Sequence, residues 1–201
     1  MDQKELKILY KSKRCGVKER LSTFKSLSEV EQQKEFVFCL LTPQSNAQRC
    51  WEAVEQIFKN GQFRRENLRE ILKSKTRFHN NKARYVSEGI KAWNKIKQNL
   101  ENPNIGELRN WLADNINGYG PKEASHFLRN IGKSNSQIAI LDRHILKNMN
   151  LARKIREVKI KSKEDYFEKE QKYLDFANSL KMPADELDLL LWSKENGEIF
   201  K

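Results

Sequence analysis

The chain of 201 residues contains few of the features that mark secreted, membrane-bound or metal-dependent proteins. Its three cysteines, Cys15, Cys39 and Cys50, are an odd number without a CxxC pair, which excludes a disulfide framework and the clustered ligands of a zinc or iron–sulfur site. No apolar run approaches the ~20 residues of a membrane-spanning helix, and the first residues lack the apolar segment of a signal peptide. We therefore expect reduced thiols, a cytoplasmic location, and no metal, cofactor or membrane partner.

The sequence also lacks the alternating pattern of strands, a βαβ rhythm and any internal repeat. The one strand-like run, residues 138–141, is too short to form a sheet. Capping boxes at Ser28 with Glu31 and at Ser45 with Gln48 instead indicate the starts of helices, and Gly61 indicates an end. We expect an all-α protein of two helical lobes that exchange segments, with helices near 29–42, 46–60, 65–74, 81–100, 105–116, 122–131, 142–150, 163–180 and 183–196.

Positive charge is abundant and unevenly distributed. The net charge is +12, of which +11 lies in residues 1–100. An excess of this size indicates a polyanionic partner, most simply nucleic acid. The near-neutral balance of residues 101–201 suggests that one basic face binds the polyanion while a less basic part has another task.

Residues 116–132 read INGYGPKEASHFLRNIG and join two predicted helices through a glycine-rich turn. Gly118 and Gly120 allow positive φ and close approach of another backbone, and Pro121 suits the first turn of the following helix. Amides beside a helix N-terminus can bind a phosphate oxygen. The stretch from about 106 to 132 therefore predicts a helix–hairpin–helix that contacts the DNA backbone through Gly118 and Gly120. An ordinary tight turn is the alternative.

Two residues near this hairpin are candidates for chemistry. Lys122 falls in the first turn of a helix, where the helix dipole disfavours positive charge, and a neutral lysine forms Schiff bases with carbonyl carbons. Asp142, 20 residues later, is placed to cap the next helix. Taken singly, Lys122 could be a solvated phosphate contact and Asp142 a plain N-cap.

Several motifs together resemble a known family, the type-2 8-oxoguanine DNA glycosylase/AP lyases of the helix–hairpin–helix superfamily. They are LLTPQSNA (40–47), RFHNNKARY (77–85), KEASHFLRNIG (122–132), AILDRHIL (139–146) and ELDLLLWSKENGEIFK (186–201). Asn46 and Ser193 depart from the residues usual in the family. The motifs extend from the first third of the chain to its last residue.

The resemblance implies a bifunctional repair enzyme that excises 8-oxoguanine. In this family Lys122 would attack C1′ of the damaged nucleotide, and Asp142 would assist its deprotonation and stabilise positive charge on the sugar. The resulting Schiff base would permit β-elimination, which cuts the strand 3′ to the abasic site. Residues 1–201 would form one unit of two intertwined lobes around a DNA-binding cleft. The partner would be duplex DNA containing 8-oxoguanine, bound by a monomer associated with the nucleoid.

Four further residues are implied in recognising the extruded base. Phe78 and Trp192 match aromatic positions of the family and would stack on the base, although ordinary core packing is the alternative for each. Asp188 lies one helical turn before Trp192 and could accept a hydrogen bond from the base. Lys201 ends the sequence, as a lysine does in the family, and would help to separate 8-oxoguanine from guanine.

Two other functions are consistent with the sequence. A non-catalytic helix–hairpin–helix protein would need the same turn but neither Lys122 nor Asp142. A related glycosylase would use the same lysine on another damaged base. In all three cases, basic side chains are candidate phosphate contacts: Lys11, Lys13, Arg14, Lys18, Arg20, Arg64, Arg65, Lys73, Lys75 and Arg77.

Overall fold

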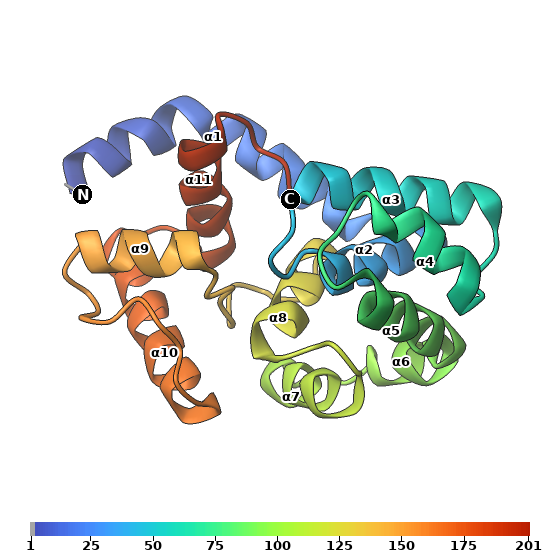
Figure 1. Ribbon diagram of the computed structural model, residues 1–201. Helices are drawn as coiled ribbons and strands as arrows, with labels where there is room; N and C mark the ends of the chain where they lie inside the picture. Colours follow the sequence, from blue (N-terminus) through green and yellow to red (C-terminus); the bar gives the residue numbers. More distant parts are fainter. Residues whose placement is uncertain (1–2) are drawn as a thin grey trace. The chain divides into compact units, whose positions relative to one another are not determined.

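The computed structural model describes residues 3–201, apart from the side chains of Gln3, Glu195 and Asn196. This part of the chain forms eleven helices and no strand, which confirms the predicted all-α class (Figure 1). The helices are α1 (Gln3–Lys25), α2 (Glu29–Leu41), α3 (Ala47–Asn60), α4 (Arg65–Lys73), α5 (His79–Lys91), α6 (Trp93–Asn99), α7 (Ile105–Asn115), α8 (Pro121–Asn130), α9 (Arg143–Leu151), α10 (Lys163–Ser179) and α11 (Ala184–Asn196).

The chain divides into two compact units. The inserted unit comprises residues 27–127, and the terminal unit comprises residues 1–26 together with 128–201. The second boundary falls within α8, so that this helix begins in the inserted unit and ends in the terminal unit. The two ends of the chain therefore belong to the same unit, whose two segments are separated in the sequence by residues 27–127.

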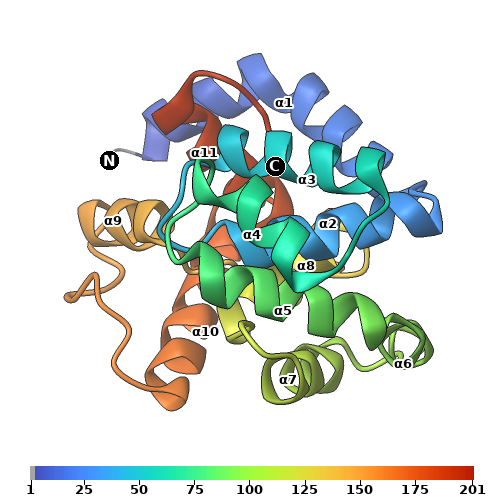
Figure 2. The same ribbon diagram turned by 45° about the vertical axis from the view of Figure 1, so that its right-hand side comes forward.

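The inserted unit is built around α2. Every residue of this helix from Glu35 to Leu41 is buried, because the helix packs against both α3 and α5 (Figure 2). The Phe36 ring lies 5.2 Å from the ring of Tyr119 and 5.6 Å from that of Phe127, which fastens the hairpin to the core. The capping box of Ser28 is present as the sequence predicts. The hairpin thus rests on the best-buried helix of its unit.

The predicted capping role of Ser45 is wrong. The N-cap of α3 is Asn46, whose side chain accepts a hydrogen bond from the backbone N–H of Arg49. The Ser45 hydroxyl is instead engaged by Lys82 and by the backbone N–H of Arg77. Asn and Ser are comparable N-caps, so these tertiary contacts decide which of the two adjacent residues takes the position.

The single helix expected over residues 81–100 is also wrong. The structure has two helices, α5 and α6, separated at Ala92, whose N–H bonds the carbonyls of both Glu88 and Ile90. Trp93 begins α6 fully buried, and its indole Nε1 donates to Glu29 at 3.0 Å. The break is associated with burying this large ring and satisfying its N–H group.

The terminal unit begins with α1, a 23-residue helix that the sequence analysis did not predict. Leu6, Val17 and Phe24 are buried on one face of α1, which packs against α11. Their spacing, with Tyr10 and Leu21 between them, is a helical period that the many lysines of the segment obscure. The hydrophobic core of the unit is completed by α9, α10 and α11.

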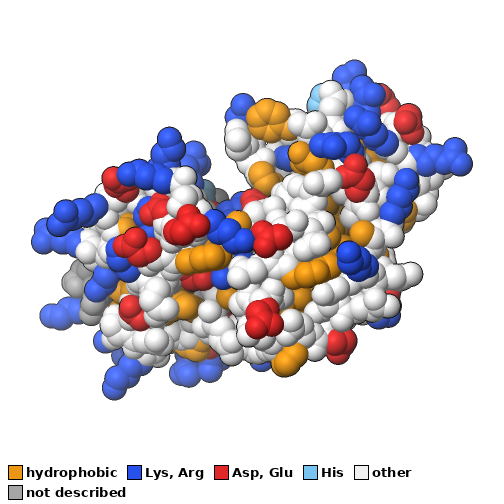
Figure 3. Space-filling model, turned by 90° about the horizontal axis from the view of Figure 1, so that it is seen from below, with side chains coloured by type: hydrophobic (Ala, Val, Ile, Leu, Met, Phe, Trp, Pro, Cys, Tyr) orange, Lys and Arg blue, Asp and Glu red, His pale blue; other side chains and the backbone are white. Residues whose placement is uncertain are grey.

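The positive charge is divided between the two units differently from its division between the two halves of the sequence. Counted by unit, the net charge is +8 for the terminal unit and +4 for the inserted unit. Figure 3 shows Lys and Arg side chains spread over much of the face that it draws. The basic first half and the near-neutral second half of the sequence do not coincide with the two units, because α1 folds with the C-terminal helices.

Candidate active site

The turn between α7 and α8 depends on Gly118. Its φ is +93°, and a Cβ at this position would lie 2.5 Å from the Tyr85 ring and 3.1 Å from Leu40. Glycine is therefore required both by the backbone conformation and by the close packing, as the sequence indicates. The hydroxyl of Tyr119 donates to the Phe36 carbonyl at 3.0 Å and holds the turn against α2.

Gly120 has a role that differs from the prediction. Its N–H donates to Glu123 Oε2 at 3.1 Å, so this amide is not open to a phosphate oxygen as expected. Glu123 was missed by the sequence analysis, although a glutamate three residues into a helix typically bonds back to the N-cap amide. The use of Gly118 and Gly120 to contact the DNA backbone stays a prediction.

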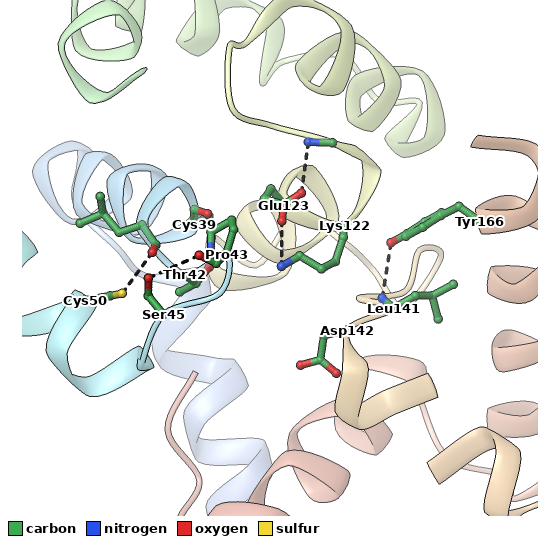
Figure 4. Close-up of polar contacts among 12 residues, drawn as sticks. Cys39, Thr42, Pro43, Ser45, Cys50, Lys122, Glu123, Leu141, Asp142 and Tyr166 are labelled. Atoms are coloured by element: carbon green, nitrogen blue, oxygen red, sulfur yellow. Dashed lines mark hydrogen bonds and ion pairs between the residues drawn. The ribbon is translucent and has the colours of Figure 1, made fainter. Parts of the chain in front are cut away.

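Glu123 also binds the candidate nucleophile. Its Oε1 lies 2.7 Å from Lys122 Nζ, and the Lys122 side chain is 26% exposed (Figure 4). The two carboxylate oxygens of Glu123 are thus divided between the backbone of the turn and the lysine ammonium. Lys122 is a sheltered lysine with a counterion at the first turn of α8, and not a fully solvated surface charge.

A second lysine lies buried in the same unit. Lys82 Nζ donates to the carbonyls of Leu41 and Pro43 at 2.6 and 2.8 Å and to Ser45 Oγ at 2.9 Å. Burial lowers the Lys82 pKa to about 8, and the positive charges of Lys122 and Arg77 act in the same direction. Three acceptors match the three N–H donors of an ammonium, so Lys82 fixes the loop that joins α2 to α3.

The cysteines are not candidates for catalysis. Cys50 donates its thiol to the Leu41 carbonyl, and burial raises its pKa to about 11. Cys39 is buried, and Cys15 is exposed. A thiol whose pKa is raised in this way carries little thiolate near neutral pH and is a poor nucleophile.

Phe78 is not a core residue. It is 53% exposed, has a φ of +57° and precedes the first residue of α5, with the Arg77 guanidinium 5.4 Å from its ring centroid. A second non-glycine residue with positive φ, Gln44, lies in the loop that Lys82 fixes. Bulky residues in this conformation are uncommon and cluster at functional sites. The exposed ring is compatible with stacking, which stays a prediction.

In the terminal unit, Asp142 accepts two hydrogen bonds. Its Oδ1 accepts from the backbone N–H of Ile145 at 2.8 Å, which confirms the predicted N-cap of α9. Its Oδ2 accepts from Trp192 Nε1 at 2.8 Å. The sequence analysis named both side chains but did not connect them. The Trp192 ring also meets the His144 ring edge-on, with centroids 5.7 Å apart.

Asp188 lies in the interior of the terminal unit. It is 3% exposed, and Arg129 Nη2 lies 3.0 Å from its Oδ2. Burial raises the Asp188 pKa to about 7, while the Arg129 charge opposes that increase. The ion pair accounts for the position of Asp188 without a ligand, and its predicted contact with an extruded base is not tested by these contacts.

The last residues pack against α1. Arg20 Nε donates to the Phe200 carbonyl at 2.6 Å, and the Lys201 side chain is buried. A Cβ at Gly16 would lie 3.0 Å from Ile199 Cδ1, so this glycine admits the returning segment. The segment is therefore held against α1, unlike a frayed chain end, and the role of Lys201 in base recognition stays a prediction.

Two searches of the described residues gave no candidate. Within residues 3–201 there is no group of three or more His, Cys, Asp or Glu side chains arranged to hold a metal ion. No helix in the same part of the chain combines the length and the apolar character needed to cross a membrane.

The comparisons with known proteins agree with one another. A family model described as 8-oxoguanine DNA glycosylase matches residues 17–182. A curated relative from Fusobacterium nucleatum, named 8-oxoguanine DNA glycosylase/AP lyase, is 41% identical over 211 aligned residues, which cover 98% of this chain and 96% of the relative.

Two solved structures are similar over almost the whole chain. The 8-oxoguanine DNA glycosylase of Thermotoga maritima has a TM-score of 0.89 and 31% identity, and covers 99% of this chain and 98% of its own. The Methanocaldococcus jannaschii 8-oxoguanine glycosylase/lyase, in complex with a 15mer DNA containing 8-oxoguanine, has a TM-score of 0.89, 31% identity and 99% coverage of both chains. The chain belongs to the 8-oxoguanine DNA glycosylase family.

Proposed function

We propose that this protein excises 8-oxoguanine from duplex DNA and then cleaves the strand, with Lys122 as the nucleophile and Asp142 as the assisting carboxylate. Family membership supports the activity. The observation that carries the assignment of the nucleophile is the sheltered position of Lys122 at the start of α8, directly after the hairpin, with Glu123 as its counterion.

The chemistry follows from an amine nucleophile. Neutral Lys122 Nζ forms a bond to C1′ while the C1′–N9 bond breaks, and the base leaves with the electron pair of that bond and takes up a proton. The amine then loses one proton, and its lone pair forms the C1′=N bond as the C1′–O4′ bond breaks. O4′ takes up a proton, so the sugar is open and joined to Lys122 as a protonated Schiff base. Removal of a C2′ proton then expels the 3′ phosphate, which is β-elimination.

The ion pair with Glu123 has a consequence for the first step. It stabilises the ammonium form of Lys122, which is not nucleophilic, so the lysine must lose a proton before it attacks. Glu123 accepts from Gly120 as well and is therefore held in place by the turn. We assign Glu123 the role of orienting Lys122 in the resting enzyme.

Asp142 supplies negative charge at a fixed place. As positive charge develops on the sugar, an oriented carboxylate stabilises it with little reorganisation. Both oxygens of Asp142 accept N–H donors of the terminal unit, so its orientation is set before substrate binds.

The damaged base must leave the duplex to reach Lys122, at the expense of a few kcal/mol that contacts in a pocket offset. The exposed Phe78 and the ring of Trp192 are proposed to stack on the base, and Asp188 and Lys201 to recognise its edge. Gly118 and Gly120 are proposed to approach the DNA backbone, together with the basic side chains. Phosphate contacts of this kind make binding fall steeply with salt.

The two units are proposed to act as one enzyme, within a monomer that works on DNA in the cytoplasm in association with the nucleoid. Lys122 comes from the inserted unit and Asp142 from the terminal unit.

A borohydride trap tests the function. Incubation with duplex DNA containing 8-oxoguanine and borohydride should yield a covalent protein–DNA adduct, which Lys122→Gln abolishes. Lys133→Gln is a control that removes a lysine of the terminal unit and should leave the adduct intact. A non-catalytic DNA-binding protein would give no adduct with the unmodified chain, and an undiminished adduct with Lys122→Gln would assign the nucleophile elsewhere.

A panel of lesions in the same assay tests the substrate. Oxidised pyrimidines and alkylated purines, each placed opposite all four bases, should give less adduct than 8-oxoguanine. A stronger adduct with one of those lesions would show that the chain has another target base.

A further inference from the structure

The Asp142 carboxylate is held by two donors that come from different elements of the terminal unit. The backbone N–H of Ile145 lies in the first turn of α9, and the indole N–H of Trp192 comes from α11. We propose that Trp192 is a positioning residue of the reaction, which acts by holding the Asp142 carboxylate through its Nε1–H group. The proposal rests on the proposed function of Asp142 and goes beyond the stacking role expected for the ring.

The two hydrogen bonds do different things. An N-cap bond to Oδ1 alone leaves the carboxylate able to turn about its last torsion, which is broad for aspartate. The second donor at Oδ2 removes that freedom and fixes the plane of the group. Both donor–acceptor distances are 2.8 Å, within the range of charge-assisted hydrogen bonds.

Trp192 is itself held in place. The residues before it on α11, from Leu187 to Leu191, are almost completely buried, and Ser193 after it is buried as well. The edge-on contact with His144 restricts the ring from a second side. An indole fixed in this way can impose a direction on its hydrogen-bond partner, because little of its own freedom remains to be lost.

The positioning role and the stacking role use different parts of the same side chain. Stacking uses the face of the ring, and positioning uses the N–H group at its edge. Trp192→Phe keeps an aromatic face and removes the donor. An abasic-site duplex contains no damaged base, so stacking contributes nothing to the rate at which the enzyme cleaves it. The proposed role of Asp142 still applies, because Lys122 must lose a proton and the Schiff base carries positive charge.

The test is therefore the single-turnover rate of cleavage of an abasic-site duplex, at saturating enzyme. We expect Trp192→Phe to lower the rate constant on the order of 10-fold, which corresponds to the loss of one hydrogen bond to a charged group. As long as the active enzyme remains saturating and in excess of the substrate, a misfolded fraction changes neither the rate constant nor the amplitude, so a lower rate constant reports on the folded protein. An unchanged rate constant for Trp192→Phe would overturn the proposal.

Trp93→Phe is the matched control. Like Trp192, Trp93 donates its indole N–H to a carboxylate, which here is that of Glu29 in the inserted unit, at 3.0 Å. The variant removes this donor. Its rate constant should equal that of the unmodified protein. A loss as large as that of Trp192→Phe would show that removing any such hydrogen bond has this effect, and would overturn the proposal.

A double variant separates this proposal from the function on which it rests. Asp142→Asn should slow cleavage more than Trp192→Phe does, and adding Trp192→Phe to Asp142→Asn should cause little further loss, because the two act through one group. Full additivity would overturn the positioning role while leaving Asp142 catalytic. An undiminished rate for Asp142→Asn would instead remove the proposed function of Asp142.

Discussion

Two buried charges, one from each unit, are stabilised in different ways. In the inserted unit, the buried ammonium of Lys82 is surrounded by three oxygen acceptors, two of them backbone carbonyls. The terminal unit buries a pair of opposite charges, Arg129 and Asp188, whose side chains are 2% and 4% exposed. The Nε and Nη1 atoms of Arg129 have no hydrogen-bond partner among the described residues.

The difference shows what each buried charge does for its unit. Lys82 takes the place of water as the donor to the carbonyls of the loop between α2 and α3. It therefore determines the course of this loop, which contains Gln44 and contacts Arg77. The Arg129–Asp188 pair links α8 to α11, the helix that carries Trp192. A charge solvated by backbone oxygens shapes a loop, whereas a charge paired with another mainly constrains which helices pack together.

Breaking the ion pair should give the largest effect on stability. Asp188→Leu leaves the buried Arg129 charge without its partner, and the free energy of unfolding should fall by about 3–5 kcal/mol. Chemical denaturation measures it. The double variant Arg129→Met with Asp188→Leu should recover most of the loss. If the double variant is as unstable as Asp188→Leu, the loss does not come from an unpaired Arg129 charge. The difference drawn between the ion pair and Lys82 would then be wrong.

Removing the lone charge should cost less. Lys82→Met keeps the length of the side chain but leaves the oxygens of Leu41, Pro43 and Ser45 without this donor, and we expect a loss of about 1–3 kcal/mol. Part of that loop reaches the surface, where water can replace the donor. Hydrogen exchange should report faster opening of residues 42–46 while α9 to α11 stay protected. A uniform increase across both units would contradict a local role of Lys82.

The free energy of unfolding should depend on pH in opposite directions through Asp188 and through Lys82. We expect these two effects to be smaller than those of the substitutions above. Burial raises the Asp188 pKa from 3.8 to about 7, so the folded state holds a proton that the unfolded state has lost. Stability should fall as the pH rises through that interval. Burial lowers the Lys82 pKa from 10.5 to about 8, so the unfolded state holds the extra proton and stability should rise between those pH values.

Each slope is measured as the difference between the unmodified protein and a variant that cannot titrate there. Asp188→Asn serves for the acid interval and Lys82→Met for the alkaline interval. Equal slopes in the unmodified protein and the matching variant would mean that the group does not titrate as described.

The helix–hairpin–helix shows which parts of the local structure the sequence predicts. The positive φ of Gly118 and the helix that begins at Pro121 depend on residues within a few positions of each other, and the structure has both as predicted. The sequence analysis did not predict the role of Glu123, although its signal is equally local: a glutamate three residues after Gly120 bonds back to the Gly120 amide.

The missing helix α1 has a different explanation. Leu6, Val17 and Phe24 follow a helical period, but eight lysines and arginines in residues 1–26 make the segment resemble a basic arm. Its partner α11 lies at the other end of the chain, and only that contact gives the apolar face of α1 a surface to bury. The charge balance of the two units could not be assigned without it.

By itself, the sequence determined the all-α class, the family, and the two residues proposed for catalysis, because caps, glycine turns and short motifs act over a few residues. Tertiary structure alone decided that Trp192 bonds Asp142 across 50 positions and that Lys82 bonds Leu41 across 41. Those contacts depend on which helices pack together, and packing is determined by the whole apolar surface rather than by any single segment.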